Sequence, residues 1–127
     1  MNDKKILLID DEPQVHEVIG KILKDKGMIV ESARSYDAGL EAIQRGPHDV
    51  IVLDVMLGGR SGLDLAKEIQ MMPPPRPFVM ILTNSINAEH IAEAMESDVT
   101  TFVQKAEHDP PEIAAMILKH FEERKTV

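Results

Sequence analysis

Short apolar runs constrain the fold of this chain most. Ile6-Leu7-Leu8-Ile9 and Val50-Ile51-Val52-Leu53 are each four residues long, and an aspartate follows each run directly. Hydrophobic runs of this length that end at polar residues are typical of strands covered on both faces, as in a parallel sheet. Ligand-binding groups gather beyond the carboxyl ends of such strands. We therefore expect Asp10, Asp11 and Asp54 to share one acidic pocket.

The alternation of apolar runs with helical periodicity continues along the chain. We predict strands at 5–9, 28–33, 50–54, 78–82 and 101–104. Helices are expected at 13–24, 36–45, from 61 or 62 to about 69, at 87–96, and from 110 onward. The proline-rich segment 71–77 is predicted to be a stiff connector because proline lacks an amide hydrogen. Strict alternation implies right-handed crossovers, so we predict an α/β fold in which a doubly wound, five-stranded parallel sheet carries five alternating helices.

Composition excludes several classes of function. The 127 residues include 22 acidic and 14 basic side chains, and the net charge of -8 argues against direct binding to nucleic acid. The absence of cysteine excludes disulfides and thiolate sites and suits a reducing compartment. No segment has the length of a signal peptide or a membrane span. We expect one cytoplasmic domain over 1–127, with its five histidines at the surface or at helix ends.

The polar residues at the strand ends are suited to metal and phosphoryl chemistry. Thr83 follows the fourth predicted strand and Lys105 the fifth. Singly, such residues are commoner as helix caps or solvated surface groups, but their shared register favours one site. Mg²⁺ prefers oxygen ligands, which Asp11, Asp54 and a backbone carbonyl would supply. An aspartate can become an aspartyl phosphate when nearby cations absorb the developing charge, and Lys105 and Thr83 are suited to assist.

These residues together resemble a known family over almost the whole chain. Asp10-Asp11-Glu12, Asp54 with Gly62 eight residues later, Thr83, and Phe102 with Lys105 resemble the receiver domains of two-component response regulators. The resemblance implies a flavodoxin-like sheet with strand order 2-1-3-4-5. It also implies that Asp54 is the phosphoacceptor, with Thr83 and Lys105 as its catalytic partners.

The resemblance further implies a mechanism. A histidine kinase or histidine phosphotransfer protein would donate the phosphoryl group, with Mg²⁺, or Mn²⁺ in its place, as cofactor. Asp10, Asp11, Asp54 and the carbonyl of Met56 would hold the metal, with Asp11 as a direct ligand and Asp10 holding a metal-bound water. Thr83 and Phe102 would then switch the face of the fourth helix, fifth strand and fifth helix toward a downstream protein or a fused effector, although Phe102 could instead stay in the core in every state. No turnover is expected beyond self-phosphorylation and autodephosphorylation.

Departures from the family pattern leave alternatives open. Gly58, Asn84 and Ala106 replace residues usual in the family, so the chain could be a phosphorylation-independent adaptor that binds protein partners. Met56 and Ser85 are not ionisable and orient water poorly, so we expect a long-lived phosphoryl group. Met56 also disfavours an aspartate-nucleophile phosphatase, which needs an acid at that position. The chain is expected to act alone, but it could be part of a longer regulator or hybrid kinase.

Overall fold

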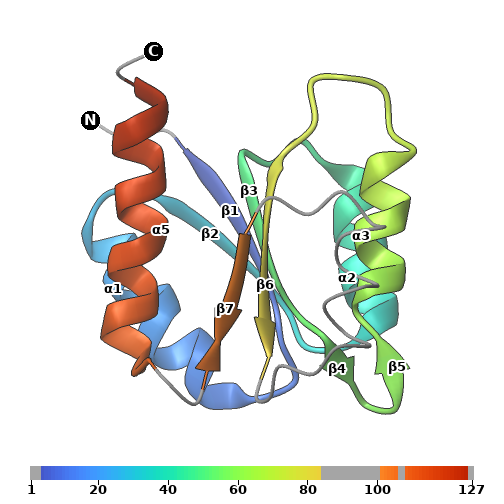
Figure 1. Cartoon of the computed structure of the whole chain (residues 1–127), viewed down its shortest axis with the longest axis horizontal. Coiled ribbons are helices and arrows are strands. Elements are labelled where there is room, and N and C mark those ends of the chain that lie inside the picture. Colours follow the sequence, from blue (N-terminus) through green and yellow to red (C-terminus); the bar gives the residue numbers. More distant parts are fainter. Residues whose placement is uncertain (1–3, 84–100, 106–107, 126–127) are drawn as a thin grey trace.

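A five-stranded parallel sheet forms the centre of the molecule (Figure 1). The computed structural model describes residues 4–83, 101–105 and 108–125. The strands are β1 (Lys5–Ile9), β2 (Ile29–Ala33), β3 (Val50–Asp54), β6 (Phe78–Thr83) and β7 (Thr101–Gln104). Their order across the sheet is β2-β1-β3-β6-β7, and every neighbouring pair is parallel. This order confirms the predicted doubly wound topology, 2-1-3-4-5 when the five strands are counted along the chain.

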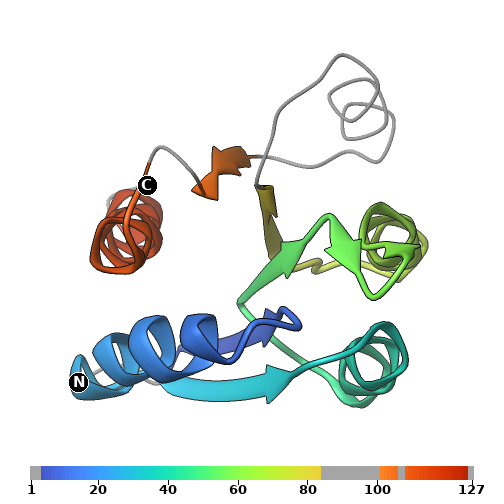
Figure 2. The same cartoon turned by 90° about the horizontal axis from the view of Figure 1, so that it is seen from below.

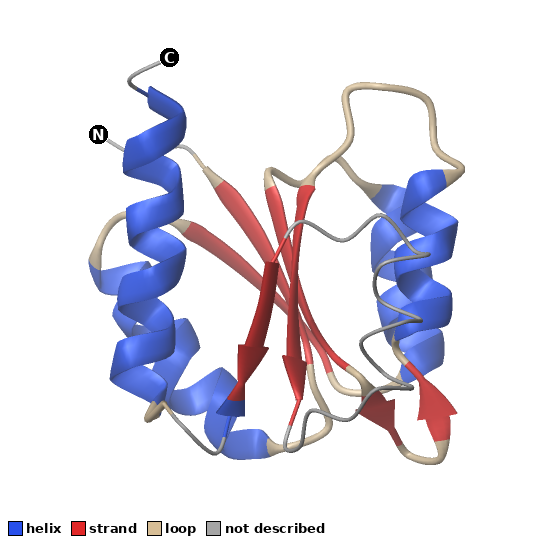
Figure 3. Ribbon diagram, viewed as in Figure 1, coloured by secondary structure: helices blue, strands red, loops and turns tan. Residues whose placement is uncertain are grey.

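Helices cover both faces of the sheet, as Figures 2 and 3 show. One face carries η1 (Val15–Ile19), its continuation α1 (Gly20–Asp25), and α5 (Pro110–Lys125). The other face carries α2 (Tyr36–Arg45) and α3 (Leu63–Gln70). The predicted helix at 87–96 lies outside the described residues. In the described part of the chain, no helix has both the length and the apolar character needed to cross a membrane.

Two apolar layers hold the helices on the sheet. Side chains alternate between the two faces along each strand, so Ile6 and Leu8 join one layer and Leu7 and Ile9 join the other. The α1/α5 layer is completed by helical residues Val15, Ile19, Leu23, Ile113, Ala114, Ile117 and Phe121. The α2/α3 layer is completed by Tyr36, Ala42, Ile43, Leu63, Leu65 and Ile69. Because both faces of the sheet are covered, the central strands consist of consecutive apolar residues.

The first helix departs from the prediction. We expected one α-helix over 13–24, but residues 15–19 form a π-helical turn before the α-helix resumes at Gly20. Single π-turns inside α-helices are frequent near functional sites. In this turn His16 is buried, and its Nε2 lies 2.7 Å from the carbonyl oxygen of Asp10. His16 thus lies in the first turn of the helix, one of the two predicted locations, but it is buried, and its hydrogen bond to the chain replaces contact with water.

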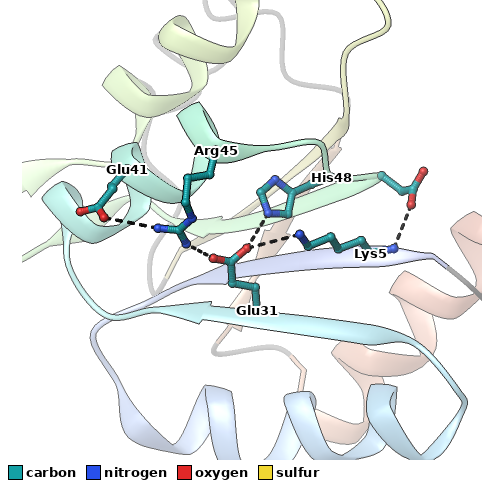
Figure 4. A network of polar contacts seen from close by, with 6 residues as sticks. Lys5, Glu31, Glu41, Arg45 and His48 are labelled. Carbon is teal, nitrogen blue, oxygen red and sulfur yellow. Dashed lines mark hydrogen bonds and ion pairs between the residues drawn. The ribbon is translucent and has the colours of Figure 1, made fainter.

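A second buried histidine belongs to a charged network at the opposite edge of the sheet, where the strands begin (Figure 4). The side chain of His48 is 2% exposed, and its Nε2 lies 2.8 Å from Glu31 Oε1. Glu31 also pairs with Arg45, at the end of α2, and lies 4.0 Å from the Lys5 ammonium. The hydrogen bond to Glu31 lowers the burial cost of His48, which the sequence predicts at the surface or a helix end.

A small hairpin after β3 was not predicted. Met56–Leu57 (β4) and Arg60–Ser61 (β5) pair antiparallel, with Met56 opposite Ser61 and Leu57 opposite Arg60. The two turn residues, Gly58 and Gly59, have φ values of 57° and 90°. Two-residue hairpin turns need positive φ, which glycine adopts without steric cost. The chain after Asp54 is therefore an ordered hairpin, described as β4–β5 below.

Candidate functional site

The residues predicted to form the site lie together at the carboxyl edge of the sheet. Asp10 directly follows β1, Asp54 ends β3, Thr83 ends β6, and Lys105 directly follows β7. Asp10, Asp54 and Thr83 are 1%, 4% and 3% exposed. These polar groups are buried because each continues a strand that is covered on both faces. The parallel topology thus places four chemically active side chains at one edge.

The Lys105 ammonium lies among three carboxylates. Its Nζ is 2.7 Å from Asp10 Oδ2, 2.8 Å from Glu12 Oε1 and 3.3 Å from Asp54 Oδ2. The lysine side chain is 10% exposed, so its contacts with the buried Asp10 and Asp54 are shielded from solvent. Charge-assisted contacts of this kind are stronger than neutral hydrogen bonds. Lys105 therefore provides the positive charge that crowded, ionised carboxylates need.

Local turns orient two of these carboxylates. The backbone N–H of Glu12 donates to Asp10 Oδ1 at 2.9 Å. The backbone N–H of Met56 donates to Asp54 Oδ1 at 3.3 Å, so the other oxygen of Asp54 faces Lys105. Gly62 packs against the same segment, because a Cβ built on it would lie 1.9 Å from the carbonyl oxygen of Asp54. The glycine eight residues after Asp54 is thus required by close backbone approach.

Burial dominates the electrostatics of the cluster. It raises the pKa of Asp54 from 3.8 to about 6, helped by the charge of Asp10 and opposed by Lys105. Burial also raises the pKa of Asp10, while contacts with Lys105 and the Glu12 N–H oppose the rise. Burial alone would lower the pKa of Lys105, but hydrogen bonds to Asp10 and Glu12 outweigh it and raise the pKa. The lysine therefore stays charged, whereas Asp54 is protonated more readily than an exposed aspartate.

The cluster has the donors of a metal site. One carboxylate oxygen from each of Asp10, Glu12 and Asp54 lies within 4.8 Å of the others. Hard divalent cations such as Mg²⁺ and Ca²⁺ bind oxygen donors of this kind. The predicted acidic pocket is therefore present for Asp10 and Asp54, but the prediction is wrong for Asp11, whose place in the cluster Glu12 takes. The arrangement of these three carboxylates could hold a cation.

The structure places the two neighbouring aspartates differently. Asp10 points into the cluster, whereas Asp11 is exposed and lines a cavity of about 210 Å³ with Tyr36 and Arg60 among its walls. The assignment of Asp11 as the direct ligand and Asp10 as the holder of a water stays a prediction. Glu12 is a member of the cluster that we did not select, although it belongs to the acidic motif. Its contact with Lys105, 93 residues later, is invisible in the sequence.

The remaining predicted residues surround the cluster. Thr83 is buried and pairs in register with Gln104 of β7. Phe102 is partly buried and packs against the α2/α3 layer. The side chain of Met56 is exposed, and its backbone borders Asp54. Asn84, Ser85 and Ala106 lie outside the described residues. The roles proposed for Thr83, Phe102 and Met56 stay predictions.

Comparison with known proteins decides the family. A family model of the response regulator receiver domain matches residues 6–118. The chain belongs to this family. As a receiver domain, it functions in two-component signal transduction, and the match includes all four residues of the cluster, Asp10, Glu12, Asp54 and Lys105.

Individual relatives agree with this assignment. The chain is 36% identical over 81 residues to the transcriptional regulatory protein DltR of Streptococcus agalactiae, a match that covers 64% of this chain and 36% of DltR. The response regulator DrrB of Thermotoga maritima, an OmpR/PhoB homologue, is 26% identical with a TM-score of 0.81, covering 98% of this chain and 54% of DrrB. A CheY-like receiver domain protein of Methanospirillum hungatei shares the fold at 20% identity, with a TM-score of 0.86 and 98% of each chain covered. The match with this chain thus covers about a third of the length of DltR.

Proposed function

We propose that this receiver domain accepts a phosphoryl group on Asp54 from the phosphohistidine of a histidine kinase or histidine phosphotransfer protein. One observation carries the proposal: the buried Asp54 carboxylate has an ammonium 3.3 Å from one oxygen and a backbone N–H 3.3 Å from the other. This arrangement orients the carboxylate and places positive charge where phosphoryl oxygens would gain negative charge. The proposed domain extends over 1–127 and works in the cytoplasm.

Mg²⁺ is the proposed cofactor, with Mn²⁺ as a substitute. The donor set fits, because Asp10, Glu12 and Asp54 offer hard oxygen atoms within one small volume. Asp54, the Met56 carbonyl, and one or both of Asp10 and Asp11 would hold the ion. When bound, Mg²⁺ would withdraw charge from the phosphoryl oxygens. Glu12 would act mainly by holding Lys105, which it contacts at 2.8 Å.

The residues of the chain have separate roles in the proposed transfer. An Asp54 oxygen attacks phosphorus, and its new P–O bond forms as the P–N bond of the phosphohistidine breaks. Lys105 pairs with the phosphoryl oxygens, and Thr83 donates its hydroxyl hydrogen to one of them. Movement of Thr83 and Phe102 then alters the face that includes β7 and α5, which would contact a downstream protein or a fused effector. Such switches bias two packings of one fold.

A labelling experiment tests this proposal. The protein is incubated with Mg²⁺ and acetyl phosphate, and intact mass is measured. We expect one phosphoryl adduct that is absent in Asp54→Asn, strongly reduced in Lys105→Ala, and lost when a chelator removes the metal. Asp64→Asn is a matched control, because Asp64 is an exposed aspartate in the first turn of α3. It should label like the wild type.

The alternative function, a phosphorylation-independent adaptor, is supported by one feature of the cluster. Lys105 lies closer to Asp10 and Glu12 than to Asp54, so an internal cation already offsets part of the acidic charge. A domain that relied on this lysine alone would need no metal. Absence of the adduct with both acetyl phosphate and a partner kinase would refute phosphoacceptor function and favour the adaptor.

A further inference from the structure

The β4–β5 hairpin cannot be stable without outside contacts. Each of its strands has two residues, and Gly58 and Gly59 form its turn. An isolated two-stranded hairpin is at best marginally stable in water, even with longer strands. The position of the segment after Asp54 must therefore be fixed by what the hairpin packs against.

Two residues of the hairpin dock it against the start of α2. Leu57 is 3% exposed and belongs to the α2/α3 core layer together with Tyr36. The Arg60 guanidinium lies 3.5 Å from the centre of the Tyr36 ring, and its Nη1 lies 3.1 Å from Asp37 Oδ1. Cation–π stacking and ion pairing by one guanidinium thus join β5 to two successive residues of α2.

The anchor on α2 is itself well fixed. Tyr36 is 9% exposed and begins the helix. The preceding residue, Ser35, caps the helix, because its Oγ accepts a hydrogen bond from the N–H of Ala38 at 3.1 Å. A contact with Tyr36 therefore ties the hairpin to a rigid part of the fold.

The other end of the hairpin is tied to Asp54. The Met56 N–H donates to Asp54 Oδ1 at 3.3 Å, and the Gly62 N–H donates to the Val55 carbonyl at 2.6 Å. Displacement of the hairpin would thus move the Met56 peptide and disturb the orientation of the Asp54 carboxylate. Arg60 also lines the cavity of about 210 Å³ that includes Asp11. Arg60 with its contacts to Tyr36 and Asp37, called the clamp below, therefore borders the same cavity as Asp11, one of the predicted metal ligands.

We propose that Arg60 is a positioning residue: by clamping the β4–β5 hairpin onto Tyr36 and Asp37, it fixes the Asp54–Met56 segment in the position that divalent-cation binding requires. This inference rests on the proposed function for its metal. Arg60 need not touch the ion, because loss of the clamp lowers the fraction of molecules whose hairpin is docked. The apparent affinity for the cation falls in proportion to that fraction.

Magnesium titration of a set of variants tests the clamp. Calorimetry should show the Kd for Mg²⁺ rising about three- to tenfold in Arg60→Ala, a range set by one partly exposed cation–π contact and one exposed ion pair. Arg60→Lys keeps the charge but loses the planar stack, so its Kd should lie between those of the wild type and Arg60→Ala. Tyr36→Phe keeps the ring and should bind like the wild type, whereas Tyr36→Leu should resemble Arg60→Ala. Arg76→Ala, at the opposite edge, is the matched control and should have no effect.

Hydrogen exchange of the amides at 56–61, measured without metal, distinguishes loss of the clamp from absence of the metal site. We expect faster exchange in Arg60→Ala, with the sheet strands unchanged. An unchanged Kd or unchanged exchange in Arg60→Ala would overturn the positioning role, because a merely solvated arginine would move neither. Wild-type protein that binds no Mg²⁺ would refute the proposed metal site. The clamp would then be judged by exchange alone, and unchanged exchange would overturn it.

Discussion

Replacing Asp54 with asparagine should stabilise the metal-free protein at neutral pH. Asp54 is 4% exposed, and burial together with Asp10 raises its pKa to about 6. A raised pKa means that the folded protein binds this proton more tightly than the unfolded chain does. Stability from this group is therefore present at low pH and is lost as pH rises from about 4 to above 6. The substituted asparagine would keep the shape of the side chain and an oxygen for the Met56 N–H without the charge.

The size of the stabilisation by Asp54→Asn follows from the pKa shift of Asp54. The pKa of Asp54 rises from 3.8 to about 6, a change of roughly two units. At about 1.4 kcal/mol per unit, the ionised carboxylate lowers the free energy of unfolding by about 3 kcal/mol. The asparagine amide would face the Lys105 ammonium with donors on both sides, which offsets about 1–2 kcal/mol of that gain. We expect Asp54→Asn to be more stable than the wild type by about 1–2 kcal/mol at pH 7.5, because removing the buried charge gains more free energy than the unfavourable amide–ammonium contact costs.

Urea unfolding with a chelator present measures this difference. The chain has no tryptophan and one tyrosine, so far-ultraviolet circular dichroism is the suitable signal. At pH 5 most folded molecules already carry the proton, so the advantage of Asp54→Asn should shrink by about 1 kcal/mol. Asp64→Asn should show no comparable gain. The reasoning fails if Asp54→Asn is no more stable than the wild type at pH 7.5, or if its advantage is equal at both pH values.

Three further predictions use other parts of the fold. Gly62→Ala should cost at least about 1–3 kcal/mol in urea unfolding, because its Cβ would lie 1.9 Å from the Asp54 carbonyl oxygen, whereas Gly20→Ala, with neighbours at 3.7 Å or more, should be close to neutral. The hydrogen bond with His48 lowers the pKa of Glu31, so Glu31→Gln should lower the free energy of unfolding by about 1 kcal/mol at pH 7. This loss should become smaller as the pH falls below 4.5, the ordinary pKa of a glutamate. An equal loss at pH 7 and pH 4 in urea unfolding would contradict this. The phosphoryl group of the labelled protein should persist well beyond seconds when its loss is followed by intact mass after removal of the donor.

The sequence was sufficient for the elements with strong local signals. Residues 36–45 are helical as predicted because Ser35 caps the start and Gly46-Pro47 prevents continuation. Residues 50–54 form the central strand because an apolar run of this length needs cover on both faces. The hairpin was missed because strands of two residues carry no visible alternation, although Gly58-Gly59 is itself a hairpin signal. The π-turn at 15–19 was missed because five residues do not distinguish its period from that of an α-helix.

The sequence was sufficient to predict which strand ends carry the site residues. Parallel strands must bring Asp10, Asp54, Thr83 and Lys105 to one edge, so their convergence followed from topology alone. The direction of each side chain did not follow from topology, because successive residues that leave a strand point to different sides. Asp10 and not Asp11 enters the cluster, and Glu12 joins it through a lysine 93 residues away. The buried pair of Glu31 and His48 likewise depends on tertiary contacts that no local pattern contains.

Charge balance links the lysine to the choice of cation. Asp10, Glu12 and Asp54 oppose one ammonium, so the fully ionised cluster has a net charge of two negative units, which a divalent cation would neutralise and a monovalent cation would not. In the metal-free protein, burial and, after it, the charge of Asp10 raise the pKa of Asp54. Because a cation stabilises the ionised carboxylate, metal binding would lower this pKa and keep Asp54 in its nucleophilic form. Lys105 holds the carboxylates together in the free protein, and a divalent cation would supply the charge that the lysine lacks.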